Sequence, residues 1–238
     1  MEIIDSHTHW GPSVTMGTEV TTTELLGQAE ECGVNRIVVF PFPSAALDDE
    51  RINERLLDET NKIKKFIPYY YIPETMKPIP EGKGFCGGKW HWMRGVQDSS
   101  SNYDALKDPR LDEFIDASET IDLPIVIEEE FAFTETFVKK TKSLKIIIPH
   151  LGGLGGNPMD FLDAFKGREN VYFDTALASS DTVMKFIDKI GHERILFGSD
   201  IPFGTMKWEL EKVLSLPIGD DKKEGILSKN LRRLIRLM

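Results

Sequence analysis

The chain has 238 residues, a length that suits one α/β barrel, so we expect residues 1–238 to form a single domain. Its formal net charge of −10 argues against general binding to nucleic acid or to anionic membranes. It says little about a small substrate, because a local pocket can oppose the global sign. The two cysteines, Cys32 and Cys86, are far apart in sequence and give no sign of a disulfide scaffold. No leader-like or membrane-length apolar run occurs, which predicts a cytoplasmic protein.

Apolar runs alternate with segments of helical periodicity along the chain. The expected strands are residues 3–4, 36–40, 66–72, 93–97, 124–127, 145–148, 171–173 and 195–197. The expected helices are a first helix that ends at Gly33, and then 48–65, 109–122, 133–143, 157–165, 180–190, 207–214 and 222–237. The segment 21–24, Thr-Thr-Thr-Glu, resembles a capping box for the first of these helices.

The third expected strand is followed by a segment, 73–92, that is rich in glycine and proline. This composition predicts a long loop in place of the helix that would normally follow. Eight strands with intervening helices otherwise predict a single (β/α)₈ TIM barrel, an α/β fold. A barrel that lacks one outer helix would expose apolar surface, which leaves assembly into a homo-oligomer open.

Two histidines follow the short apolar pair at the start of the chain. Because alternate side chains of a strand share a face, Asp5, His7 and His9 are expected to point the same way. Neutral imidazoles at a strand end are common metal ligands. Taken alone, the pair fits two solvated histidines near a terminus equally well.

Titratable side chains also follow three later strands, namely Glu128, His150 and Asp200. All lie at carboxyl ends of the expected strands, which is the face where barrel enzymes carry their chemistry. Burying these groups is costly unless they bind a metal or pair with one another. The pattern therefore predicts a metal site that includes His7 and His9.

Three segments resemble the hallmark motifs of the amidohydrolase superfamily: Asp5-Ser6-His7-Thr8-His9, Pro149-His150-Leu151-Gly152-Gly153 and Gly198-Ser199-Asp200-Ile201-Pro202. The closest branch is the amidohydrolase-2 group of metal-dependent hydrolases and non-oxidative decarboxylases related to aminocarboxymuconate-semialdehyde decarboxylase. The resemblance implies that His7 and His9 are metal ligands. It makes His150 a ligand or a catalytic acid/base. It makes Asp200 a ligand or the base that orients and deprotonates water.

The strand-five motif of that group normally ends in histidine, whereas the matching residue here is Glu128. Glutamate is a competent oxygen donor, and two histidines with a carboxylate form an established zinc set. We expect Zn²⁺, with Mn²⁺ as the alternative because it is a harder ion. One metal is expected, since no lysine or second carboxylate is clearly placed for bridging. Strand alternation predicts that Glu128 and Glu130 share a face and that Glu129 lies on the other, unless all three are a solvated strand end.

Three functions follow from this interpretation. The first is a metal-dependent hydrolase that uses a metal-activated water on a small carboxylated or cyclic substrate, with Asp200 and His150 as catalytic groups. The second is a non-oxidative decarboxylase, in which His150 protonates carbon. The third is a degenerate barrel that binds a partner without catalysis, which the departure at Glu128 would favour.

Several further residues are weaker candidates. The segment Trp90-His91-Trp92, with Arg94, could form a lid over the site or fill the gap left by the absent helix. Asp174, at the end of a strand, could line the site, and Asp98 could reach it or serve as a turn residue. The remaining candidates are Trp10, Phe40 and Phe42 as pocket walls or core, Asp5 as a group that fixes backbone, and His192 as a structural residue.

Overall fold

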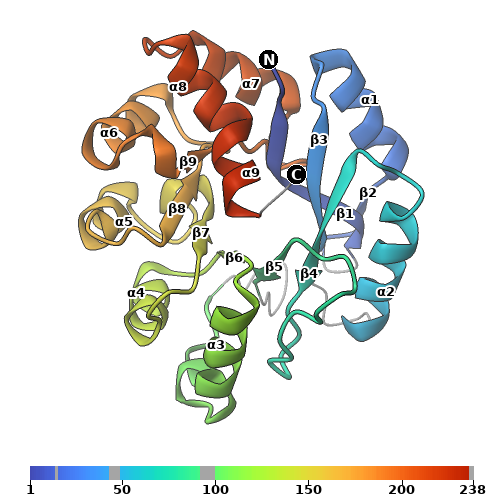
Figure 1. Ribbon diagram of the computed structural model, residues 1–238, viewed down its shortest axis with the longest axis vertical. Helices are drawn as coiled ribbons and strands as arrows, with labels where there is room; N and C mark the ends of the chain where they lie inside the picture. The colour runs from blue at the N-terminus through green and yellow to red at the C-terminus, as the bar shows by residue number, and fades with distance from the viewer. Residues whose placement is uncertain (14–15, 43–48, 92–99, 236–238) are drawn as a thin grey trace.

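A computed structural model describes residues 1–13, 16–42, 49–91 and 100–235. Its sheet curls through the middle of the molecule, with helices around it (Figure 1). The parallel strands are β1 (Ile4–Ser13), β3 (Arg36–Pro41), β4 (Phe66–Tyr71), β5 (Gly87–Trp90), β6 (Ile125–Ile127), β7 (Ile146–Ile148), β8 (Val171–Asp174) and β9 (Ile195–Leu196). An additional strand, β2 (Thr18–Val20), pairs antiparallel with β1.

The first and last parallel strands are joined by the segment that follows β9. The Ser6 N–H donates to the Phe197 carbonyl at 2.8 Å, and the His9 N–H donates to the Ile201 carbonyl at 3.0 Å. The Asp200 N–H in turn donates to the carbonyl of His7 at 2.8 Å. These bonds close the sheet and confirm the predicted barrel. They also bring the His-x-His segment beside Asp200.

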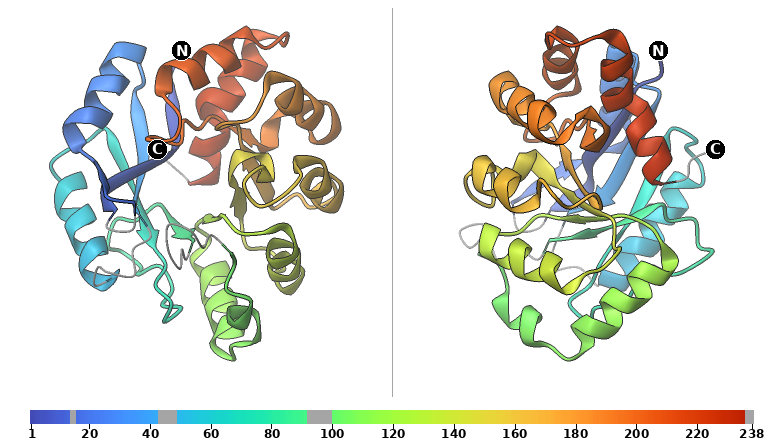
Figure 2. Two further views of the ribbon diagram at one scale, coloured as in Figure 1. Left: turned by 180° about the vertical axis from the view of Figure 1, so that it is seen from behind. Right: turned by 60° about the vertical axis from the view of Figure 1, so that its left-hand side comes forward.

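Helices pack around the outside of the barrel (Figures 1 and 2). They are α1 (Thr22–Cys32), α2 (Asp49–Thr60), α3 (Arg110–Ile121), α4 (Phe131–Lys140), α5 (Pro158–Phe165), α6 (Ser180–Ile190), α7 (Met206–Ser215), α8 (Asp220–Glu224) and α9 (Asn230–Leu234). Shorter turns of helix are η1 (Tyr103–Lys107), η2 (Pro149–Gly152), η3 (His192–Arg194) and the π-helix η4 (Gly225–Lys229). Residues 72–86, between β4 and β5, contain no helix. Over the described ranges, no helix is both long and apolar enough to cross a bilayer.

The apolar residues form two cores. The larger one lies between the outer face of the sheet and the surrounding helices. The smaller one fills the barrel interior and includes Ile4, Val38, Ile67, Val126, Ile147 and Leu196 from the strands, with Leu231 and Leu234 from α9. Figure 1 shows α9 lying across the middle of the ring of helices. Because α9 closes the amino-terminal end of the barrel, a ligand site is left for the carboxyl ends of the strands.

The expected loop 73–92 is wrong over its last part, because β5 occupies Gly87–Trp90. The glycines here allow a close approach rather than a turn. A Cβ atom on Gly87 would lie 2.5 Å from the ring of Tyr69, and one on Gly88 would lie 3.0 Å from Ile72. The first contact is shorter than a packed core tolerates and the second is tight, so the sequence resembles a loop while the backbone is a strand. The strand expected at 93–97 lies outside the described residues.

The capping box before α1 gives the first testable prediction. The Thr21 hydroxyl accepts the Glu24 N–H at 3.1 Å, and the helix ends at Gly33, whose φ of 69° is left-handed. Replacing Thr21 with alanine should lower the free energy of unfolding by about 1 kcal/mol, measured by urea denaturation. Thr23→Ala, in the exposed first turn, is the matched control and should change stability by less than about 0.5 kcal/mol. Equal losses for both variants would contradict the capping role.

Candidate metal centre

Asp5, the second residue of β1, holds the start of this strand in place. Its Oδ1 accepts the backbone N–H of His7 and the N–H of Ser199, each at 3.0 Å. A register shift lies between Asp5 and Thr8 in the pairing of β1 with β3. Burial raises the pKa of the Asp5 carboxyl to about 7, although these hydrogen bonds lower it. Asp5 therefore fixes the two chain segments that carry the site and does not itself face the cavity described below.

His7 and His9 both point at one carboxylate oxygen of Asp200. The Nε2 atoms of the two rings lie 3.2 Å and 3.1 Å from Asp200 Oδ1. All three side chains are buried. Burial opposes the charge on Asp200, but His7 and His9 outweigh it and hold the pKa of this carboxyl well below its usual range. The three residues form a compact set of two nitrogen donors and one carboxylate.

Asp174 orients this set from the end of β8. Its Oδ2 accepts the Nδ1–H of His7 at 2.7 Å, which leaves Nε2 of that ring facing Asp200. Its Oδ1 accepts the backbone N–H groups of His150 and Ala176, both at 3.0 Å. Burial and Lys89 lower the pKa of His7, but Asp174 and Asp200 raise it more, to about 9. A metal would therefore have to displace a proton from His7.

This contact gives a second prediction. Replacing Asp174 with asparagine should weaken metal affinity by about 10–100-fold, because the carboxylate that orients His7 is lost. The affinity is measured by competition with a chromogenic chelator. Asp188→Asn, the same change on the exposed face of α6, should leave the affinity unchanged. Unchanged affinity in Asp174→Asn would show that the carboxylate does not support the ligand.

His150 lies between two acidic residues. It sits in η2 with a left-handed φ of 55°, and its Nε2 is 3.7 Å from both Glu128 Oε1 and Asp200 Oδ2. Its ring centre is 4.9 Å from that of His7. The distances to both carboxylates exceed hydrogen-bond length, so neither fixes the ring nitrogen. This geometry suits a group that exchanges protons with a molecule placed between Glu128 and Asp200.

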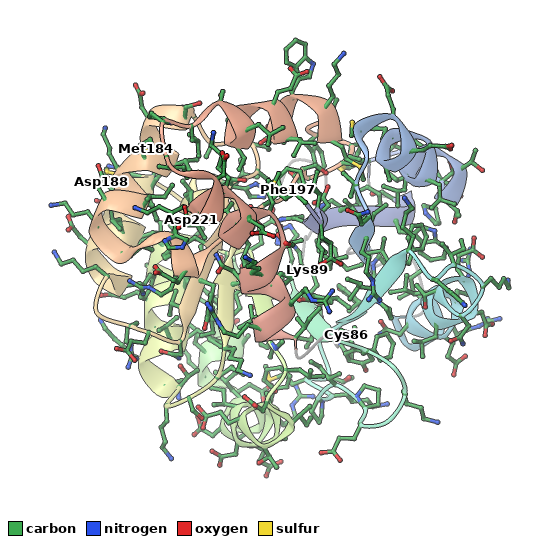
Figure 3. The ribbon with its side chains drawn as sticks, turned by 45° about the horizontal axis from the view of Figure 1, so that its top comes forward. Cys86, Lys89, Met184, Asp188, Phe197 and Asp221 are labelled. Carbon is green, nitrogen blue, oxygen red and sulfur yellow. The ribbon has the colours of Figure 1, made fainter. Side chains whose placement is uncertain are left out.

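Glu128 is paired with a lysine that sequence reasoning missed. The Lys89 ammonium donates a short hydrogen bond to Glu128 Oε2 and lies 4.5 Å above the ring centre of Phe40. Lys89 is fully buried, and Figure 3 shows it near the middle of the ring of helices. Burial raises the pKa of Glu128, but Lys89 and His91 lower it well below the ordinary value. The polar Lys89 precedes the apolar Trp90, and polar–apolar alternation is typical of a strand. This pattern could have revealed that Lys89 belongs to a strand.

The donor set fits a divalent metal. Several of its buried polar atoms have no hydrogen-bond partner: His7 Nε2, His9 Nδ1, both ring nitrogens of His150, and Asp200 Oδ2. Two sets of three residues could hold a metal: His7 with His9 and Asp200, and His7 with His150 and Asp174. In each set, every residue offers one ligand atom, and these atoms lie within 4.8 Å of one another. Nitrogen and carboxylate donors of this kind suit zinc or manganese. Glu128 belongs to neither group, so its role as a ligand remains a prediction.

A cavity of about 260 Å³ opens beside these donors. It is lined by His9, Met16, Phe42, His91, Glu128, Glu129, Glu130, Leu154, Gly155 and Phe203. The lining includes all three residues of the triplet 128–130, which follows the end of β6 at Ile127, and Glu129 is the most buried of the three. The cavity is slightly smaller than the roughly 300–1,000 Å³ typical of ligand pockets, which favours a small molecule.

The weaker candidates divide between site and core. Trp90 packs against Phe114, Phe133 and Phe137 on the helix side of the sheet, whereas His91 lines the cavity. The Trp10 indole N–H donates to the Thr22 hydroxyl, Phe40 packs against the His7 ring, and Phe42 stacks on the His9 ring. His192 lies in η3, where its carbonyl accepts a hydrogen bond from the Asn230 side chain. Trp92, Arg94 and Asp98 are outside the described residues.

Comparison with known proteins decides the family. A model described as Amidohydrolase, Amidohydro_2, matches residues 38–237. The chain belongs to the amidohydrolase-2 family. The matched range includes Glu128, His150 and Asp200 and begins after His7 and His9. No curated protein matches the sequence of this amidohydrolase-2 chain.

Solved structures extend the likeness to the whole amidohydrolase-2 chain. The 2,6-dihydroxybenzoate decarboxylase from Rhizobium matches with a TM-score of 0.76 at 17% identity over 99% of each chain. A dihydroxybenzoic acid decarboxylase from Polaromonas sp. JS666, with bound manganese and 2-nitroresorcinol, matches with a TM-score of 0.77 at 16% identity over 99% of this chain and 97% of its own. A probable 2-pyrone-4,6-dicarboxylic acid hydrolase from Acinetobacter baumannii, with citric acid bound, matches with a TM-score of 0.76 at 14% identity over 100% of each.

At these identities the likeness shows a shared fold, the TIM barrel of an enzyme family that contains both hydrolases and decarboxylases. The family is metal-dependent, and one of the similar structures holds manganese. The buried histidines and aspartates of this amidohydrolase-2 chain fit such a metal site.

Proposed function

We propose that this protein is a metal-dependent hydrolase acting on a small cyclic substrate. The observation that carries the proposal is the set of buried atoms without hydrogen-bond partners, His7 Nε2, Asp200 Oδ2 and His150 Nε2, beside a ligand-sized cavity. Leaving such atoms unpartnered costs stability unless a ligand or metal satisfies them. Their position at the carboxyl ends of barrel strands is where enzymes of this fold carry out chemistry.

The residues that would hold the metal are His7, His9 and Asp200. Glu128 would add an oxygen donor through Oε1, because Lys89 already binds Oε2. A divalent ion, Zn²⁺ or Mn²⁺, supplies a Lewis acid that polarises a carbonyl and makes water more acidic. We favour one ion, since Lys89 is engaged with Glu128 and is not placed as a further ligand.

The proton steps belong to Asp200 and His150. Asp200 Oδ2 has no hydrogen-bond partner, so it can accept the proton of the attacking water. His150 Nε2 lies 3.7 Å from Asp200 Oδ2. His150 can take up that proton, relayed by the substrate, and give it to the leaving atom. The same imidazole, when it carries a proton, stabilises negative charge that develops on the substrate carbonyl oxygen.

Water consumption tests the proposal. Metal-loaded protein is incubated in H₂¹⁸O with a panel of lactones, lactams and aromatic acids, and products are measured by mass spectrometry. The expected result is a ring-opened product that carries one ¹⁸O atom, with turnover lost in His150→Asn. Release of carbon dioxide without ¹⁸O incorporation would contradict hydrolysis. Failure to retain zinc or manganese would contradict any metal-dependent activity and favour a non-catalytic binding role.

Decarboxylation is the second candidate, and the position of His150 is the observation that favours it. A proton on Nε2 faces the space between Glu128 and Asp200, where it could be delivered to a substrate carbon. Two of the similar structures are named as decarboxylases of dihydroxybenzoates. Carbon dioxide release from an aromatic acid would support this alternative.

A further inference from the structure

The turn that follows β8 has a strained backbone. Asp174 ends β8, and the chain then turns sharply, with the Ala178 N–H donating to the Thr175 carbonyl at 3.2 Å. Leu177 lies in this turn with a left-handed φ of 56°. A leucine disfavours this conformation, and burial does not compensate, because the side chain is 40% exposed. Neighbouring elements must therefore hold the turn in place.

Two charged side chains of α7 contact this turn. The Lys212 ammonium donates to the Thr175 carbonyl at 2.7 Å and forms an ion pair with Glu209. Burial raises the pKa of the Glu209 carboxyl, while hydrogen bonds from Lys212 and from the Leu177 N–H oppose the rise. The side chains of Lys212 and Glu209 are only 13% and 12% exposed. Burying an ion pair is costly unless further polar contacts satisfy it, and the turn after β8 provides those contacts.

The same turn fixes the carboxylate of Asp174. Its Oδ1 accepts the Ala176 N–H at 3.0 Å, and Ala176 lies between the two residues that α7 contacts. Its Oδ2 accepts the Nδ1–H of His7 at 2.7 Å. A shift of the turn would move Ala176, rotate the carboxylate and release the His7 ring. A continuous series of contacts therefore runs from α7 to the ring nitrogen that faces Asp200.

We propose that Lys212 and Glu209 are positioning residues of the metal centre, which act through the turn 175–177 and Asp174 to orient His7. This inference rests on the proposed function, because it takes His7 to be a metal ligand. In the described part of the chain, neither α7 side chain lines the cavity or belongs to a donor set, so their effect on the metal is indirect. Groups that orient a ligand in this way raise the affinity of a site for its metal.

A double-mutant cycle on metal affinity tests the inference, with the Kd for Mn²⁺ measured by chelator competition. Lys212→Met should weaken binding by about tenfold, the low end for residues that support a ligand. In the Asp174→Asn background the same change should alter the Kd by less than about twofold, because the carboxylate through which Lys212 acts is absent. Unchanged affinity in Lys212→Met, or effects that add in the double variant, overturn the inference.

Further variants separate positioning from a general loss of stability. Lys223→Met removes an ammonium that donates to the Leu214 carbonyl at 2.7 Å rather than to the turn, and it should leave the Kd unchanged. Glu209→Gln keeps the size of the side chain but removes the charge that holds Lys212. It should also weaken binding, so it decides the matter if Lys212→Met does not fold. Glu211→Gln, at an exposed position of α7, is its matched control. A control that weakens binding as much as its partner overturns the assignment.

A metal-free measurement separates this inference from the proposed function. The His7 Nδ1 proton, held by a buried carboxylate, should give a slowly exchanging NMR signal that His7→Asn removes and thereby assigns. In chelator-treated protein, Lys212→Met should speed the exchange of this proton with water, and Lys223→Met should not. Exchange that Lys212→Met leaves unchanged overturns the inference even where the metal binds. Failure of the wild type to bind metal would defeat the proposed function, and the exchange rates would still decide the inference.

Discussion

Replacing His9 with alanine should abolish both metal retention and turnover. The variant loses one of the two nitrogen donors that meet at Asp200 Oδ1. In the wild type, His9 Nε2 lies 3.1 Å from that oxygen. Removing a residue that only supports a ligand weakens metal affinity by up to about 100-fold. Removing a direct ligand should therefore weaken it by more than about 100-fold. Metal content after dialysis, measured by inductively coupled plasma mass spectrometry, checks the result.

His192→Ala is the matched control for this variant. His192 lies in η3, at the other end of the barrel, where its carbonyl accepts a hydrogen bond from Asn230 at 2.7 Å. Its metal content should equal that of the wild type. Circular dichroism of His9→Ala should show a folded barrel, because the stacked Phe42 can cover the space left by the ring. Wild-type metal content in folded His9→Ala would remove this residue from the donor set.

The strand ends of the barrel were the most predictable part of the molecule. Buried parallel strands produce continuous apolar runs, and their carboxyl ends share one face, so His7, His150 and Asp200 could be placed together before any coordinates. The structure brings them together, with His150 3.7 Å from Asp200. What the sequence could not supply was Asp174 as the acceptor from His7, because that contact depends on the three-dimensional positions of β1 and β8.

The errors have a common physical cause, which is tertiary context that overrides local composition. The segment Gly87–Trp90 contains residues that disfavour strands, yet it is a strand because Tyr69 needs the space beside Gly87. Extending the expected loop to residue 92 concealed Lys89, which lies in β5.

Lys89→Met should destabilise the fold far more than a surface charge deletion would. Lys89 is fully buried, and its partner Glu128 has a side chain that is only 14% exposed. Breaking a buried ion pair by removing one partner leaves an uncompensated charge, which typically costs about 3–5 kcal/mol. Glu128 would escape part of this cost by binding a proton, so stability of the variant should improve at low pH relative to the wild type. Urea denaturation monitored by fluorescence measures the change.

The double variant Lys89→Met with Glu128→Gln separates pairing from packing. If the ion pair is the cause, removing both charges should recover most of the lost stability, since a neutral pair in the same space carries no isolated charge. Lys145→Met deletes a partly exposed partner of Asp122, 2.8 Å away, and should cost no more than about 1 kcal/mol. Equal losses in Lys89→Met and in the double variant would show that the methylene packing of Lys89 matters, and that its charge does not. Recovery would instead identify Lys89 as the counter-charge that keeps Glu128 ionised in the interior.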